Sequence, residues 1–397
     1  MRSYGEKYIE EYRPDLNKIK LIRSMRVCKT PALGGRNIHC NKCGHDHYIY
    51  FSCGHSHCSI CQSIKREQWA DKIRSELYAV PYVHIVFTLP HDLSRLARSN
   101  PTAIYGLVMR CSWKTIKELS LDESNVGALP GMISVLHTFG SDMKYHIHSH
   151  NLVTFGGLKN GAWCYPKRKD KLARYREMSS VYKRIFLEEL KELFESGSIT
   201  YHESYEQIKL SVKDKRWVVH NTKPTIDTSI LENYLARYIN RIAISNSRIE
   251  YVKDTEEVRI LYNDYRNQQS GQAAPKAYRY MNPLVAIHQI MQHVLPPYFQ
   301  KSRRYGIHAS ATKRKIADKI PEVVKRNGST IRTVMQILQQ LLTRTPYRCE
   351  ICKSTDHIIL EVKPNKQWIS KYLRINKLSR PPPMRKNRSY KKGSLFA

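Results

Sequence analysis

Three pairs of closely spaced cysteines constrain the fold of this chain more than any other feature. They are Cys40-x-x-Cys43, Cys58-x-x-Cys61 and Cys349-x-x-Cys352. Each short pair can turn two thiolates toward one tetrahedral ion, and the 14 residues between the first two pairs approach the spacing of known four-cysteine zinc sites. We therefore predict an N-terminal module built on one structural Zn²⁺, held by Cys40, Cys43, Cys58 and Cys61.

Other cysteines and histidines leave the ligand set open. Cys53 and His57 lie between the first two pairs and are alternative zinc ligands. The pair Cys349 and Cys352 has no complete ligand set nearby, so it either borrows ligands from elsewhere in the chain or binds nothing. We interpret Cys28, Cys111 and Cys164 as ordinary packing residues. Because the pairs are tight and no export signal is visible, zinc in a reducing compartment is favoured over disulfides.

Three histidines alternate in His146-Ile-His-Ser-His150, ahead of the apolar Leu152 and Val153. Alternate side chains of a strand share one face, so any two of these imidazoles could bind one divalent metal. The plainer interpretation is a polar strand with histidines at the surface. Alternation of three favours a metal site formed by His148, His150 and His146.

The charge of the chain indicates its partner. Its 397 residues carry 67 Lys and Arg against 34 Asp and Glu, a formal net charge of +33. Such a surplus attracts polyanions and releases counterions from a phosphate backbone, so nucleic acid is the leading partner. An anionic membrane surface is the alternative, but no apolar run approaches the ~20 residues of a membrane span. We expect a cytoplasmic protein with no membrane partner.

The periodicity of apolar residues gives a coarse order of elements. We predict helices over Tyr8 to Met25, Ser63 to Tyr78, Thr102 to Leu119, Ser180 to Phe194 and Ile230 to Ile244. We predict strands over Tyr82 to Leu89, Gly131 to Phe139, the histidine segment, Ile208 to Val212 and Arg216 to Val219. The second and third strands are close enough along the chain to form an antiparallel hairpin.

The helix predicted over Ile230 to Ile244 places Tyr234 and Tyr238 one turn apart on its apolar face. Two tyrosines at this spacing are ordinarily core residues. In a basic chain with a candidate metal site they indicate a different chemistry, in which a tyrosine attacks a metal-polarised phosphodiester.

Many ordered blocks of this chain resemble one family. They are Cys40-x-x-Cys-Gly-His45, His57-Cys58-x-x-Cys61-Gln62, Pro81-Tyr-x-His-x-Val-Phe-Thr-Leu-Pro90, Leu136-His-Thr-x-Gly140, His146-x-His-x-His150, Tyr234-Leu-Ala-Arg-Tyr238, Arg241-x-Ala-Ile-Ser-Asn246, Tyr262-x-Asp-Tyr-Arg266, His293-Val-Leu-Pro296 and Arg304-Tyr-Gly306. The chain is similar to the two-tyrosine HUH transposases of rolling-circle insertion sequences, the IS ninety-one type. The resemblance runs from about residue 30 to about residue 310, and the last ~80 residues match loosely.

The resemblance implies that His148 and His150 are paired metal ligands and that Tyr234 and Tyr238 are the nucleophiles. The catalytic metal would be Mg²⁺ or Mn²⁺, the product a 5′-phosphotyrosine with a free 3′-hydroxyl, and no nucleotide cofactor would be used. Two departures stand out. Where the family has a proline and then an apolar residue between the histidines, this chain has Ile147 and Ser149. A literal His-hydrophobic-His is therefore His146-Ile-His148, whereas the register onto Leu152 and Val153 favours His148 and His150. Asn240 stands where relatives often carry a histidine, which leaves the third ligand open and His146 as a candidate for it.

Several basic residues are candidate DNA contacts. Arg237 and Arg241 lie beside the tyrosines and could favour a phenolate. The run Lys167-Arg168-Lys169 and the run ending in Arg303 and Arg304, with the adjacent Tyr305, could contact phosphates and stack on bases. The substrate would be single-stranded DNA at transposon ends, with host replication proteins as further partners and a nucleoid-associated location in a bacterium.

The expected fold class is α+β: an HUH-nuclease core with a central antiparallel sheet and packed helices, a small N-terminal zinc module and a mostly helical basic C-terminal region. We divide the chain into residues 1–75 (helical lead-in and zinc module), 76–260 (nuclease core), 261–345 (basic accessory region) and 346–397 (zinc knuckle and disordered basic tail). Two other functions stay open: a rolling-circle replication initiator, and a non-catalytic zinc DNA-binding protein.

Overall fold

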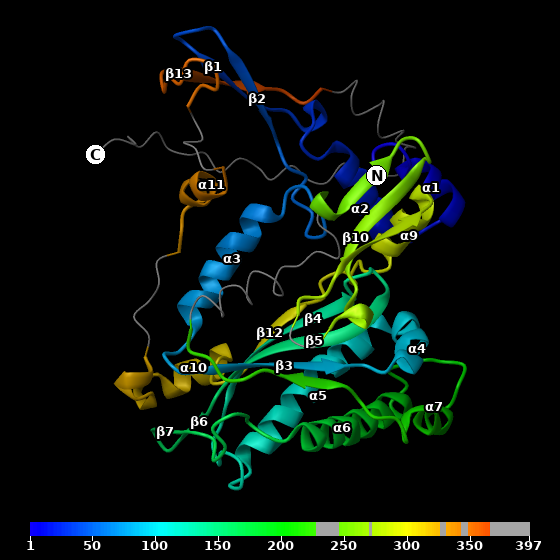
Figure 1. Ribbon diagram of the computed structural model, residues 1–397, viewed down its shortest axis with the longest axis vertical. Helices are drawn as coiled ribbons and strands as arrows, with labels where there is room; N and C mark the ends of the chain where they lie inside the picture. The colour runs from blue at the N-terminus through cyan, green and yellow to red at the C-terminus, as the bar shows by residue number, and fades with distance from the viewer. Residues whose placement is uncertain (228–245, 270–271, 326–330, 343–347, 366–397) are drawn as a thin grey trace.

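The computed structural model describes residues 1–227, 246–269, 272–325, 331–342 and 348–365 (Figure 1). It confirms the predicted α+β class. A five-stranded sheet in the order β12-β4-β5-β3-β8 forms the centre, and every neighbouring pair in it is antiparallel. Its strands are β3 (Tyr82–Thr88), β4 (Gly131–Phe139), β5 (Tyr145–Thr154), β8 (Val219–Asn221) and β12 (Ser302–Gly306).

Two long helices, α5 (Pro101–Leu121) and α6 (Tyr175–Glu195), cover one face of the central sheet (Figure 1). Helix α5 contacts β4 and β5, and α6 contacts β8. Alternate residues of β3 point into this layer, where Phe87 packs on Tyr182 with ring centroids 4.7 Å apart. The largest hydrophobic core of the described chain therefore lies between the sheet and these two helices.

The opposite face of the sheet is covered in part by α3 (Ser63–Glu76). Tyr82 of β3, Ile133 of β4 and Leu152 of β5 point to this side and pack with Ile73 of α3. Because side chains alternate along a strand, the histidines at even positions of β5 belong to this second face. The candidate metal site therefore lies on the side away from α5 and α6.

The N-terminal helices α1 (Gly5–Tyr12) and α2 (Leu16–Val27) pack against α9 (Pro283–Met291), through a core that includes Ile22 and Ile287. A three-stranded antiparallel sheet lies beside α9 (Figure 1). Its strands are β9 (Ile249–Val252), β10 (Glu257–Asn263) and β11 (Lys276–Met281). Residues assigned from sequence to an accessory region thus share a core with the N-terminal module, and β12 from the same region joins the central sheet.

A third sheet, in the order β13-β1-β2, joins the last described strand to two strands of the N-terminal region. It contains β1 (Gly35–Cys40), β2 (Asp46–Tyr50) and β13 (His357–Val362), and Figure 1 shows it at one end of the molecule, beyond α3. The remaining elements are η1 (Pro31–Leu33), η2 (His91–Leu93), α4 (Ser94–Ser99), β6 (Gly157–Lys159), β7 (Ala162–Cys164), α7 (Tyr205–Val212), η3 (Asn246–Arg248), η4 (Tyr265–Asn267), α10 (Ser310–Ile316), η5 (Ala317–Lys319), η6 (Glu322–Val324) and α11 (Val334–Leu342). None of the described helices has both the length and the apolar character needed to cross a membrane.

The predicted hairpin of the strand Gly131 to Phe139 with the histidine strand is confirmed. The strand predicted over Ile208 to Val212 was wrong, because these residues form helix α7. A capping box starts this helix: the Ser204 side chain accepts from the backbone N–H of Gln207, and the Gln207 side chain accepts from the backbone N–H of Ser204. The strand predicted to end at Val219 instead begins there, as β8.

Candidate functional site

Three histidines converge on the second face of the central sheet. In the antiparallel register of β4 and β5, His137 lies directly opposite His148, and His150 follows two residues along the same face. The candidate ligand nitrogens of these residues all lie within 4.8 Å of one another, and Nε2 of His148 is 3.0 Å from Nε2 of His150. All three side chains are buried. The strand pairing alone therefore assembles a compact three-nitrogen site.

Hydrogen bonds on the far side of two rings set their orientation. Nδ1 of His148 lies 3.0 Å from the backbone oxygen of His146, which can only accept, so Nδ1 carries the proton and Nε2 keeps its lone pair. Nδ1 of His150 lies 3.0 Å from Nε2 of His84 on β3. Burial, with contributions from His220 and His148, lowers the pKa of His84 to about 3, so this ring is neutral and able to accept. A metal-binding histidine typically donates its second N–H in this way.

This geometry suits a divalent cation. When both Nδ1 atoms are protonated, two Nε2 lone pairs face each other at 3.0 Å and repel unless a positive charge lies between them. Two neighbouring ligands of an octahedral ion, each about 2.1 Å from it, are about 3.0 Å apart. The donor set therefore fits such an ion, with coordination positions left open for a substrate.

The other face of β5 explains the departure at Ser149. The Ser149 hydroxyl lies 2.8 Å from that of Ser112 on α5, and Asn151 donates to Ser149 Oγ and to the carbonyl oxygen of Ile85. The Ser149 bond connects β5 to α5 at the position between the two histidines, and the Asn151 bond connects β5 to β3 next to His150. They hold the backbone that carries His148 and His150 in place.

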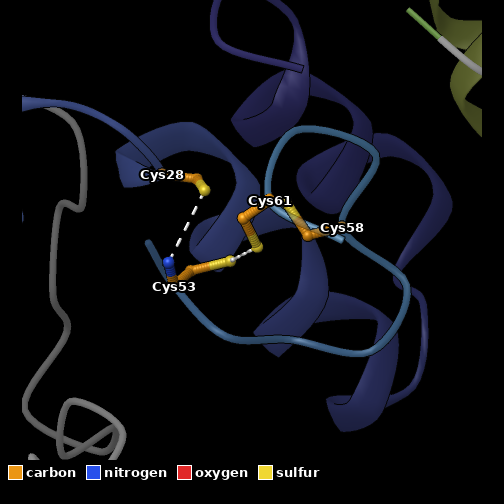
Figure 2. A group of neighbouring side chains, drawn as sticks. All are labelled: Cys28, Cys53, Cys58 and Cys61. Carbon is orange, nitrogen blue, oxygen red and sulfur yellow. Dashed lines mark hydrogen bonds between the residues drawn. The ribbon is translucent and has the colours of Figure 1, made fainter. Parts of the chain in front are cut away.

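The ten cysteines include two groups of four. Figure 2 shows the first group, Cys28, Cys53, Cys58 and Cys61, at the end of α2. Sγ of Cys53 lies 3.7 Å from Sγ of Cys61, and the backbone N–H of Cys53 points to Sγ of Cys28. The second group is Cys40, Cys43, Cys349 and Cys352. Four thiols gathered in this way match the ligand set of a structural zinc site.

Comparisons with known proteins agree with this arrangement. A family model described as a putative transposase matches residues 131–315, and one described as a transposase zinc-binding domain, of the IS ninety-one type, matches residues 1–89. The chain is 30% identical over 316 residues to the putative transposase y4qJ of Sinorhizobium fredii, covering 77% of this chain and 78% of the relative. This chain belongs to the IS ninety-one type transposases. It is also 25% identical over 344 residues to the transposase for insertion sequence element IS801 of Pseudomonas savastanoi pv. phaseolicola, covering 84% and 82% of the two chains. No solved structure matches.

The zinc-binding domain of this transposase differs from the sequence prediction. The grouping of Cys40, Cys43, Cys58 and Cys61 around one ion was wrong, because Cys40 and Cys43 lie with Cys349 and Cys352, whereas Cys58 and Cys61 lie with Cys28 and Cys53. Cys28, interpreted as a packing residue, is buried in the N-terminal core and also lies beside Cys53, Cys58 and Cys61. Cys53 belongs to the first group, whereas Nε2 of His57 accepts from the backbone N–H of Leu295 and lies in neither group. Burial, with His55 and Lys301 contributing, lowers the pKa of His57 to about 4.

The predicted third ligand, His146, lies outside the group of three histidines that the structure brings together. His146 is exposed and lies one strand repeat, about 6.6 Å, beyond His148, so it is not within ligand distance of His150. His137 takes this place because it faces His148 across the hairpin. Sequence reasoning did not single out His137. A β-bulge between His137 and Phe139 shifts the register, so counting back from the turn would have placed Ile147 opposite His137 and missed the pairing.

The predicted nucleophiles Tyr234 and Tyr238 lie outside the described residues, as do Arg237, Arg241 and Asn240. The described chain stops at Asp227, close to Thr225, which bridges to Tyr82 at the start of β3. It resumes at Asn246, and Arg248 then donates to the backbone oxygen of Ser141 in the β4–β5 turn.

The other predicted DNA contacts fall in different places. Arg304 forms an ion pair with Glu76 of α3, and Arg303 lies over the ring of Phe299 with its Cζ 5.4 Å from the centroid. The adjacent Tyr305 is partly buried and stacks on Trp113 beside the main core, with ring centroids 5.5 Å apart.

The run Lys167-Arg168-Lys169 follows β7, and the backbone N–H of Lys167 donates to the oxygen of Asn125 ahead of β4. Because His137 lies six residues into β4, roughly 20 Å along it, this run is at the other end of the sheet from the histidines.

Proposed function

We propose that this transposase cuts and rejoins single-stranded DNA through a tyrosine and moves its element by rolling-circle transposition. The observation that carries the proposal is the convergence of His137, His148 and His150, whose candidate ligand nitrogens all lie within 4.8 Å of one another. The resemblance to two-tyrosine HUH transposases supplies the nucleophiles, Tyr234 and Tyr238. Membership of a transposase family supports strand transfer as the overall reaction.

The chemistry of the step follows from the groups involved. A divalent cation bound by the three imidazoles would bind a non-bridging phosphate oxygen and stabilise the negative charge that develops during the displacement. One tyrosine attacks as its phenolate, which forms a bond between its oxygen and phosphorus. The bond from phosphorus to the 3′ oxygen breaks, and that oxygen leaves as a hydroxyl after gaining a proton. The 5′-phosphotyrosine keeps the bond energy for rejoining, so no nucleotide cofactor is needed.

The histidine content of the site bears on the metal. Three imidazole nitrogens are softer ligands than the oxygens that Mg²⁺ prefers, and affinity for such sites rises along the first-row series from Mn²⁺. We therefore expect Mn²⁺ to support the reaction at lower concentrations than Mg²⁺.

The described residues on either side of the tyrosine segment approach opposite ends of β5. Thr225 lies beside Tyr82, which pairs with Thr154 at the end of β5. Arg248 donates to the backbone oxygen of Ser141, ahead of the start of β5. These contacts support the proposal that the tyrosines act at the histidines of β5.

DNA binding would draw on the large positive charge of the chain. We propose that Arg237 and Arg241 act beside the tyrosines and that Arg303 and the run of residues 167–169 contact phosphates farther away. The N-terminal zinc module would recognise the element, the residues after it would form the nuclease core, and host replication proteins would supply the rest of the process. A nucleoid-associated location follows from this proposal.

The test is formation of a covalent adduct. Labelled single-stranded DNA from the ends of the element is incubated with the protein and Mn²⁺ or Mg²⁺, and adducts are separated on a denaturing gel. We expect His148→Ala and His150→Ala to abolish the adduct, and His202→Ala, a change of an exposed histidine after α6, to leave it intact. Tyr234→Phe with Tyr238→Phe should also abolish it while DNA binding persists. Adduct formation by this double variant would contradict the proposal.

A further inference from the structure

We propose that Cys40, Cys43, Cys349 and Cys352 bind a second structural zinc ion, which fastens the C-terminal segment of the chain to its N-terminal zinc-binding domain. Sγ of Cys40 lies 3.5 Å from Sγ of Cys352, and Sγ of Cys43 lies 3.6 Å from Sγ of Cys349. Zinc–sulfur bonds of about 2.3 Å in a tetrahedron place the sulfurs about 3.8 Å apart, whereas a disulfide requires about 2.05 Å. The observed spacing matches four ligands around one ion.

The two halves of this site are folded alike, although 306 residues separate Cys43 from Cys349. The backbone N–H four residues after the first cysteine donates to the carbonyl of that cysteine: Gly44 to Cys40, and Lys353 to Cys349. The N–H of the first cysteine in turn donates to the carbonyl of the residue five positions later, His45 or Ser354.

Both turns also use a left-handed residue at the same position, with φ of 71° at Gly44 and 61° at Lys353. A side chain at positive φ is uncommon and indicates a turn fixed by its surroundings. Two matching turns facing each other form the two halves of a four-cysteine site. The C-terminal pair is therefore not an isolated half-site.

Backbone pairing leads directly into the site. Strand β13 pairs with β1 over six residues, from Gly35 opposite Val362 to Cys40 opposite His357. Just beyond Cys40, the Asn41 side chain donates to the carboxylate of Asp356. At the other end, the N–H of Asn365 donates to the carbonyl of Pro31. The last described residues of the chain are thus tied along the full length of β1.

The ion would supply stability that this pairing lacks. Strand β13 is an edge strand with β1 as its neighbour in the sheet, and its apolar side chains Ile358, Ile359 and Leu360 are each nearly half exposed. A short strand with so little burial docks weakly, whereas structural zinc contributes folding free energy directly. We infer that docking of β13 depends on the ion.

The inference goes beyond the family comparison and does not rest on the tyrosine chemistry. The zinc-binding match ends at residue 89 and the putative-transposase match at residue 315, so neither includes Cys349 or Cys352. The first group, Cys28, Cys53, Cys58 and Cys61, lies wholly inside the zinc-binding match and serves as an internal control.

The test uses the zinc-loaded full-length protein and a thiol-alkylating reagent, with the alkylation rate of each cysteine read from peptide masses. Zinc-bound thiolates react slowly because the ion holds their lone pairs. We expect Cys43→Ser to lose one zinc per chain and to make Cys349 and Cys352 react faster. Cys349→Ser should lose one zinc and make Cys40 and Cys43 react faster. The double variant Cys43→Ser with Cys349→Ser should lose no more zinc than either single change.

Two control variants separate ligand loss from general unfolding. Cys53→Ser disturbs the first group and should leave Cys349 and Cys352 slow, and Cys164→Ser, outside both groups, should keep the full zinc content. The proposal is overturned if Cys349→Ser keeps all its zinc, or if Cys349 and Cys352 react as slowly in Cys43→Ser as in the unaltered protein. A double variant that loses twice the zinc of either single change would also overturn it.

Discussion

The hydrogen bond between His84 and His150 offers a sharp test of the histidine centre. Nε2 of His84 lies 3.0 Å from Nδ1 of His150, and its acceptance of that proton leaves the His150 Nε2 lone pair for a metal. In His84→Leu nothing at this position accepts the proton, so the His150 ring can move it to Nε2 and lose the ligand. Loss of such a partner typically weakens metal binding 10- to 100-fold, which corresponds to about 1.4–2.7 kcal/mol.

Calorimetric titration with Mn²⁺ measures this effect directly. We expect His84→Leu to raise the Kd by 10- to 100-fold, and His84→Gln, whose amide oxygen can accept the proton, to retain most of the affinity. His220→Leu changes the exposed neighbour of His84 on β8 and should bind Mn²⁺ normally. Equal affinity in His84→Leu and the unaltered protein, with both folded, would refute the reasoning.

Three further predictions concern stability. Trp217 is buried against Tyr182 in the main core. Trp217→Ala should lower the free energy of unfolding by about 3–5 kcal/mol, as measured by denaturant titration. Gly306→Ala should lower the melting temperature, because φ is 58° and an added Cβ would lie 1.9 Å from the backbone oxygen of Pro130; an unchanged Tm would contradict this strained contact. Burial raises the pKa of Asp71, but hydrogen bonds from Arg332 outweigh it and hold that pKa below its usual value. The stability that Asp71 contributes is therefore present above about pH 4 and lost as the pH falls through the lowered pKa, so Asp71→Ala should cost about 2 kcal/mol at neutral pH and less in acid. A pH-independent difference would show that the ion pair is not responsible.

Local sequence signals predicted the central elements well. The strand β4 has the predicted bounds, Gly131–Phe139, because its sequence is rich in apolar residues, as suits a strand buried on both faces. Helix α7 was missed because Ile208, Leu210 and Val212 alternate like a strand, although the capping pair Ser204 and Gln207 indicated a helix start.

The sites were harder to predict because they depend on partners distant in the chain. Spacing within Cys40-x-x-Cys43 shows that the pair can bind zinc, but strand pairing between β1 and β13 decides which second pair completes the group. His137 joins His148 through the register of a hairpin rather than through a local motif. The assignment of Tyr234 and Tyr238 as nucleophiles rests on helical periodicity and the family resemblance.

The most direct test of the account is to map the covalent link between protein and DNA. After reaction with an end of the element and Mn²⁺, the adduct is digested and the nucleotide-bearing peptide is sequenced by mass spectrometry. The account predicts a nucleotide on Tyr234 or Tyr238, formed in the unaltered protein and lost in His137→Ala and His148→Ala. A link to any other residue, or a link that forms equally without His137 and His148, would contradict it.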